Sequence, residues 1–89
     1  MYLARVIGNV WATRKDEHLS GLTLQVIQPM DRKRNDVGDP IVAVDTVGAG
    51  RGETVMYVTA REAVIPLPVT EAPVDASIVG IVDRIDISE

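Results

Sequence analysis

The chain has 89 residues, a formal net charge of −4, no cysteine, and aromatic side chains only at Tyr2, Trp11 and Tyr57. An acidic chain poor in aromatics is unsuited to nucleic acid, which needs a basic face and stacking platforms, and the missing cysteines exclude disulfides and zinc–thiolate sites. No apolar run approaches the roughly 20 residues that span a bilayer, and the N-terminus has no secretory signal pattern. We therefore expect one soluble domain over residues 1–89, located in the cytoplasm, with no nucleic-acid or membrane partner.

The N-terminal half favours two strands separated by a charged loop. Residues 2–11 are rich in β-formers, and their period of two predicts one apolar face directed at the core. That face consists of Tyr2, Ala4, Val6, Gly8 and Val10. Residues 22–28 predict a second strand, which Pro29 should end because proline lacks the N–H that a sheet ladder needs. The polar stretch 31–40 is typical of a solvated hairpin tip, with a basic docking patch as the alternative.

The C-terminal half favours three more strands. Residues 41–47 and 54–59 are rich in β-branched side chains, and residues 80–87 alternate between apolar and charged. Three prolines at positions 66, 68 and 73 exclude a long helix between them, but allow single helical turns at 60–64 and 74–78. Five short strands predict an all-β fold, a small OB-like barrel with one or two helical turns, because closure removes exposed sheet edges.

Catalytic chemistry lacks a matching set of residues. His18 is the single histidine and lies in a charged loop, without the nucleophile and orienting partner that a catalytic base requires. No cluster has metal-ligand spacing, so we expect neither metal nor cofactor, and no enzyme activity. Asp45 and Glu53 flank the glycine-rich segment. We interpret them as surface residues or as acceptors for turn amides, rather than as a catalytic pair.

The glycine-rich segment at Gly48, Gly50 and Gly52 has the spacing G-x-G-x-G. A dinucleotide-binding loop has G-x-G-x-x-G and opens a helix, whereas this segment precedes a predicted strand, and the lysine of a nucleotide-triphosphate loop is missing. Glycine also permits positive φ and close approach of another backbone. We therefore interpret the segment as a turn pressed against another surface, such as a second copy of the chain.

Three stretches together resemble a known family, the vertex proteins of bacterial microcompartments of the ethanolamine-utilisation (EutN) and carboxysome (CcmL) type. They read "ARVIGNVWATRKDEHLSGLTLQVIQPMD" from residue 4, "AVDTVGAGRGETVMYV" from residue 43 and "APVDASIVGIVDRIDI" from residue 72. They occur in the family's order and cover about three quarters of the chain. The family's "G-S-S-A-R"-like segment is matched only by Ala60 and Arg61, and residues 62–71 diverge from it.

The resemblance implies a homopentamer that caps the vertices of a polyhedral shell in the cytoplasm, with hexameric shell proteins as partners. We hypothesise that the subunit boundary near the five-fold axis consists of Gly48, Ala49, Gly50, Arg51, Gly52 and Glu53. Arg51 and Glu53 would pair across this boundary. A second hypothesis assigns the docking of facet hexamers to Arg14 and Lys15, because Lys15 matches the lysine of the family pattern T-x-K-x-x-x-L-x-G. The alternatives are an oligomeric scaffold outside any shell and an OB-fold binding module.

Overall fold

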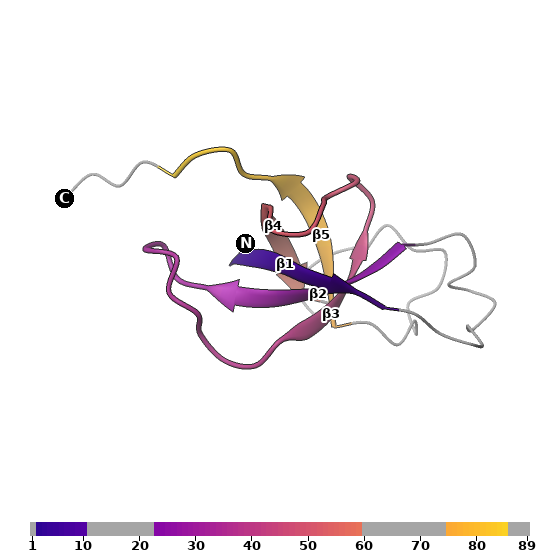
Figure 1. Ribbon diagram of the computed structural model, residues 1–89, viewed down its shortest axis with the longest axis horizontal. Coiled ribbons are helices and arrows are strands. Elements are labelled where there is room, and N and C mark those ends of the chain that lie inside the picture. The colour runs from indigo at the N-terminus through magenta and orange to yellow at the C-terminus, as the bar shows by residue number, and fades with distance from the viewer. Residues whose placement is uncertain (1, 11–22, 60–74, 86–89) are drawn as a thin grey trace.

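Five strands close into a barrel in the computed structural model, which describes residues 2–10, 23–59 and 75–85 (Figure 1). The strands are β1 (Tyr2–Asn9), β2 (Thr23–Met30), β3 (Ile41–Asp45), β4 (Thr54–Thr59) and β5 (Ala76–Ile81). Their order around the barrel is β1-β2-β3-β5-β4, and β4 pairs with β1 to complete the ring. The pairing of β3 with β5 is parallel and the other four are antiparallel. The predicted five-stranded barrel is confirmed.

Alternating small and large side chains fill the barrel interior. Ala4, Ala43 and Ala76 are fully buried, and their small volumes leave room for the equally buried Ile27 and Ile78. A barrel of five strands has little interior space, so large residues fit only where facing positions are small. Burying each isoleucine stabilises the fold by about 2–3 kcal/mol.

The predicted core face of β1 is confirmed at its centre. Ala4 and Val6 are buried, with 0% and 1% of their surface exposed. Tyr2 remains 44% exposed at the start of the strand, where its ring packs on that of Tyr57 with 5.5 Å between the centroids. The sequence pattern therefore gave the correct face, but it did not show that β1 begins at the end of the barrel.

Pro29 does not end β2, contrary to expectation. The strand continues to Met30, and Pro29 lies opposite Ala4 of β1. The pairing of β2 with β3 extends only to Ile27, so the side of Pro29 that lacks an N–H faces no strand there. Its carbonyl oxygen instead accepts a hydrogen bond from the Val37 N–H at 2.9 Å. Proline is tolerated in this strand because the ladder has already ended on that side.

The predictions for the C-terminal strand and its preceding helical turn are wrong. The predicted strand at 80–87 is instead Ala76–Ile81, and the predicted turn at 74–78 overlaps it. This strand lies between β3 and β4, and Ala76, Ser77 and Ile78 are all buried. Such a strand has no apolar–polar alternation to reveal it. The described residues contain no helix, and therefore no helix long and apolar enough to cross a bilayer. The helical turn predicted at 60–64 lies outside the described residues.

The 31–40 segment is exposed from residue 32 onward, as expected of a hairpin tip, but it is well ordered by side-chain contacts. Asp31 Oδ1 accepts hydrogen bonds from the backbone N–H groups of Lys33 (2.8 Å) and Asn35 (2.9 Å). The Asn35 N–H, more than any other group, lowers the pKa of Asp31. Arg34 donates to Thr54 Oγ1 at 2.6 Å from a left-handed backbone conformation with φ 67°. An Arg5–Asp36 ion pair at 3.1 Å fastens the segment to β1.

Candidate functional site

The glycine-rich loop 46–53 joins two strands that are not neighbours in the barrel. It leaves β3 and enters β4, and β5 lies between these strands, so the loop has to cross β5 (Figure 1). At its start the Thr46 hydroxyl donates to the Ile78 carbonyl of β5 at 3.4 Å. At its end the Gly52 N–H donates to the Val6 carbonyl at 2.8 Å, and the Val6 N–H donates to the Glu53 carbonyl at 3.0 Å. The loop is thus attached to both β5 and β1.

Asp45 organises the first half of the loop. Its carboxylate is buried, and one oxygen accepts from the N–H groups of Val47 and Gly48, each at 2.9 Å. The other oxygen accepts from the Ala49 N–H at 2.8 Å. Hydrogen bonds to an ionised acceptor are stronger than neutral ones, so these three bonds hold the backbone firmly. Of the two alternatives predicted for Asp45, a surface residue or an acceptor for turn amides, the structure shows the second.

Gln25 holds the loop from inside the barrel. Its amide nitrogen donates to Asp45 Oδ2 at 3.2 Å and to the Ala49 carbonyl at 2.9 Å. Ala49 is 5% exposed and belongs to the core cluster, so the loop inserts one methyl group into the interior. The Gln25 Oε1 atom is buried and has no partner among the described residues. β2 contains two glutamines, Gln25 and Gln28, and the sequence does not distinguish the one that holds the loop.

The three glycines have different roles. Gly48 and Gly52 adopt φ of 79° and 89°, values that favour glycine over residues with a side chain. Gly50 does not need positive φ, and a Cβ added to it would lie 3.1 Å from Glu53 Oε1. The Gly50 N–H donates to this same carboxylate oxygen, while the Glu53 N–H donates to the Gly50 carbonyl at 3.1 Å. Glu53 is therefore also an acceptor for a turn amide.

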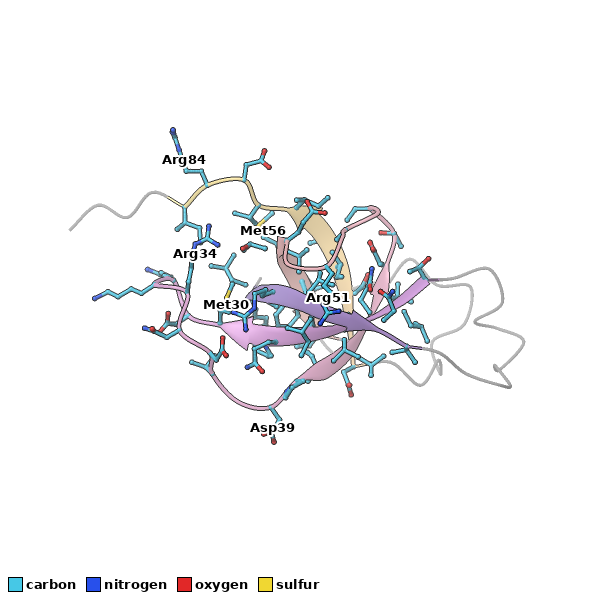
Figure 2. The ribbon with its side chains drawn as sticks, viewed as in Figure 1. Met30, Arg34, Asp39, Arg51, Met56 and Arg84 are labelled. Atoms are coloured by element: carbon cyan, nitrogen blue, oxygen red, sulfur yellow. The ribbon has the colours of Figure 1, made fainter. Side chains whose placement is uncertain are left out.

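The six residues predicted for a subunit boundary are consecutive in the loop, and one of them, Ala49, is directed inward. Ala49 is buried, whereas Arg51 and Glu53 are exposed. Arg51 makes no hydrogen bond or ion pair with any described residue, and Glu53 Oε2 likewise has none. In the view of Figure 2, the labelled Arg51 side chain is drawn across the strands of the barrel. The loop therefore presents a cation and a partly used carboxylate that have no further partners in the described part of the chain.

Arg14, Lys15 and His18 lie outside the described residues, so the hypothesis of a facet-docking rim stays a prediction. Within the described ranges, no group of three acidic or histidine residues is positioned to hold a metal ion. The Asp45 carboxylate is fully engaged with the loop backbone and with Gln25. The site is thus a turn whose backbone is held by hydrogen bonds to the buried side chain of Asp45.

The fold and the site define the class of protein, which is a small closed β-barrel with one loop held by hydrogen bonds to buried side chains. Residues 1–83 match the family described as "Ethanolamine utilisation protein EutN/carboxysome". The chain therefore belongs to the EutN/CcmL family, as the sequence motifs indicated.

The similarity to individual relatives extends from end to end. The chain is 42% identical over 86 residues to the bacterial microcompartment shell vertex protein GrpN of Rhodospirillum rubrum (strain F11), covering 97% of both chains. It is 36% identical over 85 residues to the carboxysome shell vertex protein CcmL of Thermosynechococcus vestitus, covering 96% of this chain and 86% of the relative. The structure of the GrpN pentameric microcompartment shell protein from Rhodospirillum rubrum matches with a TM-score of 0.79 at 41% identity, over 99% and 100% of the two chains.

Proposed function

We propose that this chain is a structural shell protein of a bacterial microcompartment, which forms homopentamers that cap the shell vertices. The observation that carries the proposal is the end-to-end similarity to relatives named as shell vertex proteins, one of them solved as a pentameric shell protein. The saturated carboxylate of Asp45 supports a structural rather than an enzymatic role. The protein would act in the cytoplasm, within the shell.

The proposed mechanism is geometric. A flat layer of hexamers has no curvature, and replacing a six-fold unit by a five-fold unit at each corner allows the layer to close. Each subunit has to present two different surfaces, so that one copy meets the next after a rotation of about 72° and the ring closes after five copies. A rigid barrel suits this task because a flexible subunit would not hold the angle between its two surfaces.

We place the loop 48–53 at the boundary between subunits, close to the five-fold axis. Its backbone is held by Asp45 and its glycines carry no side chains, so a neighbouring backbone could approach closely. Arg51 of one copy would pair with Glu53 of the next through Oε2, which has no partner among the described residues. Such pairing would offset the repulsion among five Arg51 side chains around one axis.

The partners at the rim of the pentamer would be hexameric facet proteins. Arg14 and Lys15 are our candidates for this contact because Lys15 matches the family pattern T-x-K-x-x-x-L-x-G. Charge reversal by Lys15→Glu should lower the yield of closed shells while leaving the pentamer intact. Unchanged shell closure in that variant would remove these two residues from the proposal.

Native mass spectrometry and shell assembly test the proposed function. The purified protein should show five times the subunit mass of 9.6 kDa. Co-expression with facet hexamers should yield closed polyhedral shells, and omission of this chain should yield open or elongated ones. Pentamers that leave shell closure unaffected would point to the alternative of an oligomeric scaffold outside a shell, and a monomer at high concentration would contradict both.

The Gly50→Val variant tests the placement of the loop. The added side chain would first meet the flexible end of Glu53, so the barrel should remain folded. If the loop lies at the boundary, the variant should lower the pentamer fraction in native mass spectrometry. A folded variant with an unchanged pentamer fraction would contradict this placement.

A further inference from the structure

The outer face of the barrel carries a row of three polar side chains, one on each of three neighbouring strands. Gln28 of β2 and Thr54 of β4 are both cross-strand partners of Arg5 in β1, so the three residues lie side by side. Each of them adjoins a core residue in its own strand and therefore points outward. Gln28 and Thr54 are nevertheless only 8% and 7% exposed, so another part of the protein covers them.

Residues 31–38, which we call the strap, lie over this row; in Figure 1 they form the turn beyond the tip of the β2 arrow. Arg34 donates to the Thr54 hydroxyl at 2.6 Å, which holds the strap to β4. The Gln28 side chain donates to the Gly38 carbonyl at 3.2 Å, which holds the other end of the strap to β2. The strap thus spans from β4 to β2, with β1 between them.

An ion pair fastens the middle of the strap to β1. Arg5 donates through Nη1 to Asp36 Oδ1 at 3.1 Å and through Nη2 to Asp36 Oδ2 at 3.4 Å. The same Nη1 donates to the sulfur of Met30 at 3.6 Å. We call the Arg5–Asp36 pair the latch. Its two side chains are 38% and 55% exposed, so the latch is accessible to dissolved ions.

The strap is held by polar contacts rather than by burial. Residues 32–40 are all exposed, and the bridge between Met30 and Asp36 is isolated from the ladders of the barrel. Arg34 has a left-handed backbone conformation, φ 67°, that residues with a side chain seldom adopt, which opposes closure. Segments with few buried apolar contacts open at a much lower free energy than the core does. The strap can therefore leave its row while the barrel remains closed.

We propose that the strap opens and closes on the intact barrel as one unit, and that the Arg5–Asp36 latch controls this equilibrium. Closure covers the row, and opening presents the amide, guanidinium and hydroxyl groups of three strands on one face. Salt weakens ion pairs at a protein surface, so the strap acts as a cover that responds to the ionic environment. All these groups belong to one subunit, so the device does not depend on the proposed pentamer.

Native-state hydrogen exchange, followed by NMR, tests the separate opening. The Val37 N–H donates to the Pro29 carbonyl at 2.9 Å and reports on the strap, while the Val6 N–H donates to the Glu53 carbonyl at 3.0 Å and reports on the barrel. The protection factor of Val37 should be at least about tenfold lower than that of Val6. Equal protection of the two amides would overturn the inference, because the strap would then open only when the barrel unfolds.

Salt and substitution together test the latch. Raising the salt to about 1 M should increase the exchange of the Val37 amide in the wild type about two- to fivefold. Asp36→Asn keeps the size of the side chain but removes its charge, so it should produce a similar increase at low salt and abolish the salt response. A wild type that does not respond to salt, or an Asp36→Asn variant that still does, would contradict the role of the latch.

Two further variants serve as controls for the latch. Asp36→Glu retains the charge and should keep the salt response. Asp39→Asn should behave like the wild type, because Asp39 is exposed, follows the strap and makes no hydrogen bond with the described residues. Unchanged protection of the Val6 amide checks that every variant remains folded. A loss of the salt response in Asp39→Asn would show that the general charge of the segment, and not the latch, controls opening.

Oxidation by hydrogen peroxide tests whether opening uncovers the face of β2. Met30 is 6% exposed beneath the strap, and Met56, which is partly buried on β4, provides an internal reference. Peroxide converts an accessible thioether into a sulfoxide. Asp36→Asn should raise the ratio of Met30 to Met56 oxidation about two- to fivefold, measured by mass spectrometry of peptides. An unchanged ratio would mean that the strap does not leave this face, contrary to the inference.

Discussion

At the scale of single residues, Asp45 determines the conformation of the loop that we place at the subunit boundary. One buried carboxylate accepts three backbone N–H groups and the amide of Gln25. Backbone amides in a turn that lacks ladder partners need another acceptor, since a buried amide without one costs free energy. Asp45 supplies this acceptor within the barrel, which leaves the outer side of the loop available for contacts.

Asp45→Ala should lower the free energy of unfolding by about 3 kcal/mol, because the amides of residues 47–49 lose a charged acceptor. Chemical denaturation at neutral pH measures the change. Asp39→Ala is the matched control, as Asp39 is exposed and makes no hydrogen bond with the described residues, and its effect should stay within roughly 0.5 kcal/mol. Equal stability of the two variants would show that the loop amides find other partners.

At the scale of elements, the loop 46–53 is specified by backbone conformation as much as by contacts. Gly48 and Gly52 have positive φ, while Gly50 does not. The sequence shows three equivalent glycines at every second position, and only the backbone distinguishes the two that are conformationally required from the one that leaves space beside Glu53. The interpretation of the segment as a turn was correct, but the division of roles within it could not be predicted.

Gly52→Ala should lower the free energy of unfolding by about 1–2 kcal/mol, because an alanine at φ 89° is strained whatever space surrounds it. Gly50→Ala serves as the comparison and should cost less, since the added methyl group meets only the movable carboxylate of Glu53. Urea denaturation of both variants measures the difference. If Gly50→Ala were the more destabilising, the close contact with Glu53 would matter more than the backbone conformation.

Strand β1, in which buried and exposed residues alternate, was predictable from the sequence, whereas strand β5, whose buried residues are consecutive, was not. In β1, alternation identified the buried Ala4 and Val6 correctly. In β5 the buried residues Ala76, Ser77 and Ile78 follow one another, and the alternating residues further along the chain misplaced the strand. Local periodicity reports on the contrast between two faces, and a strand without that contrast gives no such signal.

At the scale of the whole molecule, stability and assembly should be linked. A chain of this size buries only about 60–65% of its unfolded surface, so its own core provides modest stability. Association of folded subunits adds to it by mass action, because only the folded barrel has the contact surfaces. The proposed ring is thus both the function and a source of stability for the subunit.

The apparent Tm of the wild type should therefore rise with protein concentration, over a hundredfold range measured by differential scanning fluorimetry or calorimetry. Gly50→Val, which should weaken assembly, should show a smaller dependence on concentration. Val37→Asp should behave like the wild type, because Val37 is exposed and lies outside the loop 46–53. A Tm independent of concentration in the wild type would mean that the subunit is stable without its neighbours.

The amino-acid sequence by itself determined the fold class and the family, because these depend on residue types and on patterns local in the chain. It did not determine that β3 pairs in parallel with β5, that Gln25 holds Asp45, or that Ala49 of the loop enters the core. These features arise from contacts between residues far apart in the chain. Only closure of the barrel brings such residues together, and so only the tertiary structure decided which surfaces remain to meet another subunit.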